Sequence, residues 1–73
     1  MKDKLNLLPD QIGSFRLNIS KDDDMWTVCY ESDYGYLRLP NDKHNKCYFN
    51  DTDLEVCVDK TLEWIDNNND KLN

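Results

Sequence analysis

The spacing of hydrophobic and polar residues changes once along the chain, from strand-like alternation to a helical repeat. Ser14–Ser20 alternates apolar with polar side chains, which predicts a strand with one buried face. Met25–Glu31 is rich in β-branched and aromatic residues and carries apolar side chains on both faces, so we expect a central strand. Tyr36–Leu39 predicts a third strand that ends at Pro40, because proline cannot donate to a ladder. Cys47–Phe49 predicts a short fourth strand.

The segments between these strands are polar. Lys21–Asp24 and Asn41–Lys46 contain no apolar residue and are expected to be loops. Ser32–Gly35 is expected to be a turn in which Gly35 supplies a positive φ. Short polar connections of this kind predict an antiparallel meander.

Asp51–Asn69 has the helical repeat. Thr52 and Glu55 match the T-x-x-E capping box, in which each side chain accepts a hydrogen bond from the other residue's backbone N–H. The asparagines of Asn67–Asn69 are expected to end the helix through a left-handed residue. At about 100° per residue one broad stripe is expected to face the core; it contains Leu54, Cys57, Val58, Thr61, Leu62, Trp64 and Ile65.

Met1–Gly13 carries several leucines ahead of Pro9 and predicts an arm or a single helical turn over one end of the core. The expected fold class is therefore α+β, a single domain over residues 1–73. A small antiparallel sheet of three or four strands carries one C-terminal helix, Asp51–Asn67, packed on one face. The expected core consists of Phe15, Leu17, Ile19, Trp26, Val28, Leu37, Leu39, Phe49, Leu54, Val58, Leu62 and Ile65.

Charge narrows the range of partners. The formal net charge is −6 with 33% charged residues, which disfavours direct binding of nucleic-acid phosphates and favours a basic partner. We expect no signal peptide and no membrane span, and therefore a cytoplasmic protein whose three cysteines are reduced. Heavy use of Asn, Asp and Lys with no Ala suggests AT-rich coding sequence, as in a low-GC bacterium or its phage.

Candidate chemistry is sparse. His44 and Cys47 have H-x-x-C spacing, and Cys29 and Cys57 would be needed to complete a zinc site. Structural zinc sites usually present ligands in close pairs, and buried thiols account better for these cysteines, so no metal or cofactor is expected. No base–nucleophile pair and no glycine-rich phosphate loop are recognisable, so no enzymatic activity is expected.

An acid row on the helix is the most suggestive feature. Glu55, Asp59, Glu63 and Asp66 are spaced four, four and three residues apart and share one edge of the helix. Like charges at i and i+4 destabilise a helix, so the row is a candidate for partner binding. Rows of carboxylates can imitate nucleic-acid phosphates and occupy a basic groove of another protein. A solvated helix face is the open alternative.

Tyrosines provide a second candidate surface. Tyr30, Tyr34, Tyr36 and Tyr48 belong to the middle strands and their turn. If Leu37 and Leu39 face the helix, then Tyr36 and Arg38 lie on the open sheet face, and both residue types are common at binding hot spots. The alternative is that the tyrosines cap the edges of the core.

In size, charge, sheet-plus-helix plan and acid row, the chain resembles the small acidic inhibitors that phages and mobile elements carry, anti-CRISPR proteins among them. That resemblance implies an inhibitor, anti-CRISPR-like or a DNA mimic, that blocks a basic, nucleic-acid-handling host protein. The segment DTDLEVCVDKTLEWI also resembles the helix that closes the β-β-β-α half of HicB-type antitoxins, which implies a protein-interaction module that binds through the open sheet face. Pairing with a second copy of the chain is a further expected arrangement.

Overall fold

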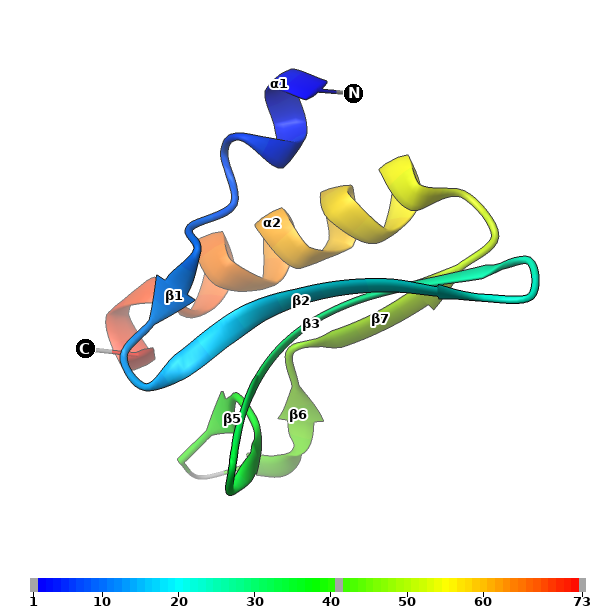
Figure 1. Ribbon diagram of the computed structural model, residues 1–73. Helices are drawn as coiled ribbons and strands as arrows, with labels where there is room; N and C mark the ends of the chain where they lie inside the picture. Colours follow the sequence, from blue (N-terminus) through cyan, green and yellow to red (C-terminus); the bar gives the residue numbers. More distant parts are fainter. Residues whose placement is uncertain (1, 41, 73) are drawn as a thin grey trace.

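The fold is α+β, as the sequence predicts. The computed structural model describes residues 2–40 and 42–72. In chain order the elements are α1 (Lys2–Leu5), β1 (Gln11–Ile12), β2 (Phe15–Asp22), β3 (Met25–Ser32), β4 (Gly35–Tyr36), β5 (Arg38–Leu39), β6 (Asp42–Lys46), β7 (Tyr48–Asp51) and α2 (Leu54–Leu72). In Figure 1, α2 runs along one side of β2, β3 and β7, and α1 lies beyond α2 at the N-terminal end of the chain.

β3 is the central strand of the sheet, as predicted. Along one edge it pairs antiparallel with β2, from Arg16 opposite Glu31 to Asp22 opposite Met25. Along its other edge it pairs first with β7 and then with β4. β1 extends the sheet outward from β2.

The expected third strand is divided. Leu37 separates β4 from β5, and β5 leaves the main sheet to pair with β6 in a two-stranded ladder. The prediction of a loop over Asn41–Lys46 is therefore wrong for residues 42–46, which form β6. Asn41 lies outside the described residues. β6 is held by backbone hydrogen bonds to β5, and its side chains show no apolar alternation. The hydrophobic pattern therefore does not predict this strand.

The first hairpin is tighter than predicted. β2 continues to Asp22, and only Asp23 and Asp24 form the turn. Asp23 has φ 55°, in the left-handed region that aspartate tolerates better than most residues. Gly35 has φ 122°, so the expected positive φ at the second turn is confirmed.

The helix begins one residue later than the capping-box prediction requires. Asp53 is the N-cap: its carbonyl accepts from the Cys57 N–H at 3.3 Å, and its Oδ1 accepts from the Glu55 N–H at 3.0 Å. The Asp53 N–H in turn donates to Asp51 Oδ1 at 2.9 Å. The Thr52–Glu55 box is therefore wrong, because a carboxylate is a stronger acceptor for these N–H groups and the Glu55 side chain has another partner.

The predicted end of the helix is also wrong. α2 continues through Asn67–Asn69 to Leu72, and the Asn68 side-chain amide donates to the Trp64 carbonyl at 2.7 Å. Asn68 is buried, so its amide is satisfied inside the helix and does not favour a left-handed exit.

The core lies between α2 and the sheet in two clusters. One contains Tyr30, Leu37, Leu39, Cys47 and Trp64, and the other contains Leu8, Val28, Cys57 and Val58. The predicted stripe of α2 faces these clusters: Cys57, Val58, Thr61 and Trp64 are buried, and Leu54, Leu62 and Ile65 are partly buried.

Most of the predicted core is confirmed, with one exception. Ile19 is 36% exposed although Val28 opposite it is fully buried, because β2 is the edge strand at this position and β1 pairs only with Phe15 and Arg16. The N-terminal arm does cover the core: Leu5 and Leu8 pack in the cluster around Val58.

Candidate functional site

Half of the predicted acid row is bound within the molecule. Lys4 of α1 lies 2.9 Å from Glu55 Oε1 and 3.1 Å from Asp59 Oδ1. The hydrogen bond to Glu55, then the one to Asp59, raises the pKa of Lys4. These two carboxylates therefore hold the N-terminal turn against α2, a role the sequence did not suggest because the residues are 51 and 55 positions from Lys4.

The other half of the acid row is not bound within the part of the molecule that the structure describes. Glu63 and Asp66 are exposed, and neither forms an ion pair with any residue that the structure describes. Glu63 lies at the middle of α2 and Asp66 three residues further on, and both precede the last turn of the helix, which carries Lys71.

Tyr36 lies on the open face of the main sheet, as predicted, whereas Arg38 belongs to β5, which pairs with β6 outside that sheet. Leu37 between them is buried in the core, and neighbouring side chains in an extended segment point to opposite sides. Tyr36 is also directly opposite Glu31 on β3, which follows the buried Tyr30 and therefore points to the other face of the sheet. Arg38 is exposed, and its Nη2 lies 3.3 Å from where a Cβ of Gly35 would be, so its guanidinium packs along the β3–β4 turn.

Tyr48 completes an aromatic pair with Tyr36. Tyr48 is opposite Cys29 and Tyr36 is opposite Glu31, and positions 29 and 31 share one face of β3. Because β4 and β7 follow each other along the same edge of β3, the two tyrosines are neighbours, with ring centroids 4.9 Å apart and ring planes at 61°.

Lys46 reaches over both rings. Its Nζ lies 5.4 Å from the Tyr36 centroid and 5.4 Å from the Tyr48 centroid, within the range of a cation–π contact. Cys47 is buried on the core side, so Lys46 and Tyr48 both point to the open face. We call Tyr36, Tyr48 and the space above their rings the tyrosine notch. The sequence carried a signal for it, a Lys-x-Tyr alternation around a buried cysteine, which the strand assignment missed.

The other two tyrosines have different roles. Tyr30 is fully buried, and its hydroxyl donates to the Pro9 carbonyl at 2.6 Å. Burial, followed by the nearby Cys47 and Asp10, raises its pKa. Tyr34 is 97% exposed at the tip of the β3–β4 turn. Tyr30 is therefore a core residue and not part of a binding surface.

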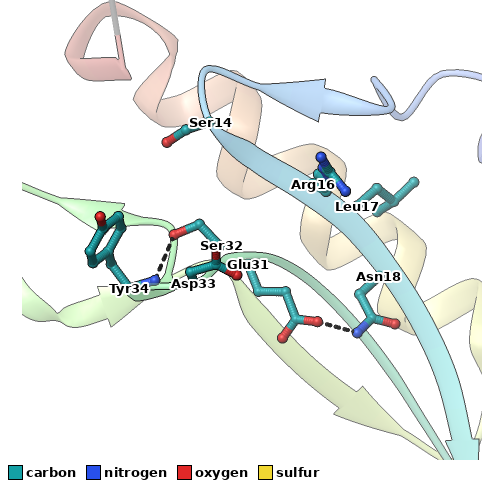
Figure 2. Close-up of a pocket in the computed structure, with 8 residues that line it drawn as sticks. All are labelled: Ser14, Arg16, Leu17, Asn18, Glu31, Ser32, Asp33 and Tyr34. Carbon is teal, nitrogen blue, oxygen red and sulfur yellow. Dashed lines mark hydrogen bonds between the residues drawn. The ribbon is translucent and has the colours of Figure 1, made fainter.

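A cleft of about 520 Å³ adjoins the notch. Figure 2 shows its lining from the β1–β2 turn, β2, the end of β3 and the β3–β4 turn, with Asn18 Nδ2 donating to Glu31. Glu31 and Asp33 contribute carboxylates and Arg16 a guanidinium. Glu31 belongs to both features, since it lines the cleft and lies opposite Tyr36.

The zinc candidates are not brought together. Among the residues that the structure describes, no group of three His, Cys, Asp or Glu side chains is placed to hold a metal ion. Cys29, Cys47 and Cys57 are buried free thiols, and His44 is exposed on β6. Burial raises the pKa of Cys29 to about 11 and that of Cys47 to about 12. The absence of bound metal remains a prediction, which elemental analysis of the purified protein would check.

Comparisons with family models, with curated proteins and with solved structures find no match to this chain. Within the described residues, no helix is long and apolar enough to cross a membrane. What the protein does must therefore be argued from its surfaces.

Proposed function

We propose that this chain is a non-enzymatic, acidic binding protein of the cytoplasm. In this proposal a phage or mobile element carries it as an inhibitor, in the manner of an anti-CRISPR protein or a DNA mimic. It blocks a basic host protein that handles nucleic acid. A net charge of −6 supports a basic partner and disfavours nucleic acid itself as the ligand.

The observation that carries the proposal is the exposed end of the acid row. Glu63 and Asp66 are exposed on α2 and form no ion pair within the described part of the chain. Placing like charges there costs stability, and the Lys and Arg side chains of a basic groove would offset that cost on binding.

Charge reversal tests the proposal. Glu63→Lys with Asp66→Lys should abolish capture of the partner from a host lysate, and capture by the unaltered protein should weaken steeply as salt is raised. Reversing Glu55 in place of Asp66 is less clean, because Glu55 also binds Lys4.

Asp22→Lys with Asp24→Lys is the matched control, since it changes the net charge equally at the remote tip of the β2–β3 hairpin. If the control abolishes capture as completely as the α2 reversal does, overall charge and not the acid row governs binding. If neither reversal affects capture, the proposal is wrong.

The second candidate is an antitoxin-like or housekeeping interaction module that binds through the open sheet face. The contact between Tyr36 and Tyr48 favours it, because tyrosines presented together on an uncovered face are a common centre of protein interfaces. Arg38 lies at the border of the same surface. If Tyr36→Ala removes binding and the charge reversal on α2 has no effect, this second candidate is favoured over the first.

A further inference from the structure

The tyrosine notch already holds a cation. Lys46 Nζ is equally distant, 5.4 Å, from the two ring centroids, and the rings meet edge to face and form two walls. Aromatic walls around an ammonium group are the arrangement by which proteins recognise lysine and its methylated forms. Lys46 therefore shows what kind of group the notch accepts.

We propose that the notch is a binding site for a lysine or arginine side chain of a basic partner, and that Lys46 is an internal occupant which this side chain displaces. The inference rests on the proposed function, because it assumes that the partner is basic. It adds a second contact surface, on the face of the sheet opposite α2.

The charges around the notch suit a basic segment. Glu31 lies opposite Tyr36 and continues into the adjoining cleft, where Asp33 adds a second carboxylate. A partner segment with one cation over the rings would present its next cation to these carboxylates. Arg16 and Arg38 border the same area and repel further cations, so the site accommodates one cation over the rings and a second at the carboxylates.

The internal cation gives the proposal a distinctive signature. Lys46→Gln removes the competing occupant and leaves both rings in place, so binding of an oligolysine peptide should tighten about two- to fivefold, the worth of an exposed cation–π contact. Lys46→Gln also makes the protein more acidic, which by itself would favour a basic peptide. The effect on the notch must therefore be separated from the effect on overall charge.

Lys21→Gln is the matched control. Lys21 is also a β-sheet lysine over an aromatic ring, with Nζ 5.2 Å from the Trp26 centroid, but it lies near the hairpin tip. The two substitutions change the net charge by the same amount. If Lys46→Gln increases the affinity for oligolysine more than Lys21→Gln does, the difference measures the cost of displacing Lys46 from the rings.

Titration of the full-length protein with oligolysine, followed by calorimetry and by NMR of the tyrosine rings, makes the measurement. We expect the Tyr36 and Tyr48 ring signals to shift. Tyr36→Leu and Tyr48→Leu should each weaken binding, whereas Tyr48→Phe should retain it, because the ring and not the hydroxyl faces the cation. Amide spectra identify variants that are folded.

The outcomes separate this inference from the proposed function. If Lys46→Gln and Lys21→Gln have equal effects on affinity, or if the NMR shifts are confined to Glu63 and Asp66 on α2, the notch is not the binding site. The proposal of an acidic binding protein would then still stand. No oligolysine binding at any surface would overturn both. Binding of a single-stranded oligonucleotide that weakens in Lys46→Gln would also overturn the inference, since it would make Lys46 a contact and not an occupant.

Discussion

At the scale of single residues, tyrosine serves two opposite purposes in this molecule. Tyr30 is fully buried and donates to the Pro9 carbonyl, so it fastens the segment that enters β1 to the central strand. Tyr36 and Tyr48 lie on the other face of the sheet. The residue type alone does not distinguish these roles; the register does, because positions 30 and 31 of β3 point to opposite faces.

The Tyr30 hydroxyl can be tested alone. Tyr30→Phe keeps the ring and removes the donor, so we expect a loss of about 0.5–1.5 kcal/mol in the free energy of unfolding. Urea denaturation measures the loss. The Leu17 amide, which donates to the Asp10 carbonyl beside the same segment, should also exchange faster with solvent. Unchanged stability and exchange would show that this hydrogen bond does not hold the arm.

The buried thiols predict a loss of stability in alkali. The pKa of Cys29 is raised to about 11 and that of Cys47 to about 12, chiefly by burial. Above the ordinary thiol pKa the unfolded chain loses these protons while the folded chain keeps them. Stability is therefore complete below about pH 9 and falls as the pH rises toward 11 and 12. Denaturation midpoints across this range check the sign, and a rise in stability would contradict it.

At the scale of elements, the N-terminus of α2 allows a test of which residue, Asp53 or Thr52, caps the helix. Asp53→Ala should cost about 1 kcal/mol, because it removes the acceptor of the Glu55 N–H. Thr52→Ala is the matched control and should change stability little, since Thr52 is exposed and precedes the N-cap. Thermal unfolding of the two variants gives the comparison. A larger loss of stability for Thr52→Ala than for Asp53→Ala would support the Thr52–Glu55 capping box instead.

The packing of α2 on the sheet gives a second comparison. Leu62 is partly buried against the Val58 cluster, so Leu62→Ala should cost about 2 kcal/mol, the lower end for a core leucine. Ile19 has the same predicted role in the sequence but is 36% exposed, and Ile19→Ala should cost less than about 1 kcal/mol. Equal losses in urea denaturation would mean that the edge of the sheet at Ile19 is packed more closely than the structure shows.

The hydrophobic pattern predicts the strands that bury a face and the helix that covers them, because burial acts on those positions directly. It fails at β6, whose polar residues are ordered by backbone pairing and by contacts such as Asn45 Oδ1 accepting from Trp64 Nε1 at 2.7 Å. It also fails at the ends of α2, where a single hydrogen bond decides the boundary. The candidate site follows the same division. The burial of Leu37 predicts Tyr36 on the open face, but the hydrophobic pattern does not predict that Arg38 leaves the main sheet with β5 or that Lys46 lies in a strand.

At the scale of the whole molecule, charge is divided between two surfaces. The N-terminal part of the acid row is neutralised by Lys4, and the C-terminal part is exposed. On the opposite face, the sheet presents rings, a lysine and scattered carboxylates. A basic partner that contacts only α2 leaves the sheet face free, and one that wraps around the edge of the molecule meets both. The contact of Lys4 with Glu55 and Asp59 joins residues far apart in the sequence, so the hydrophobic pattern does not predict it.

The joining of Lys4 to α2 has a consequence for the order of folding. The contact closes a loop of 51 residues, whereas the β2–β3 hairpin closes over a two-residue turn. Long-range contacts with few supporting neighbours usually form after the rate-limiting barrier, so the N-terminal turn should dock last and detach first. Leu8→Ala, which removes its buried anchor, should therefore speed unfolding in stopped-flow experiments and leave the refolding rate nearly unchanged. Slower refolding would place the arm in the nucleus, and the two ends of the chain would then have to meet before the sheet is complete.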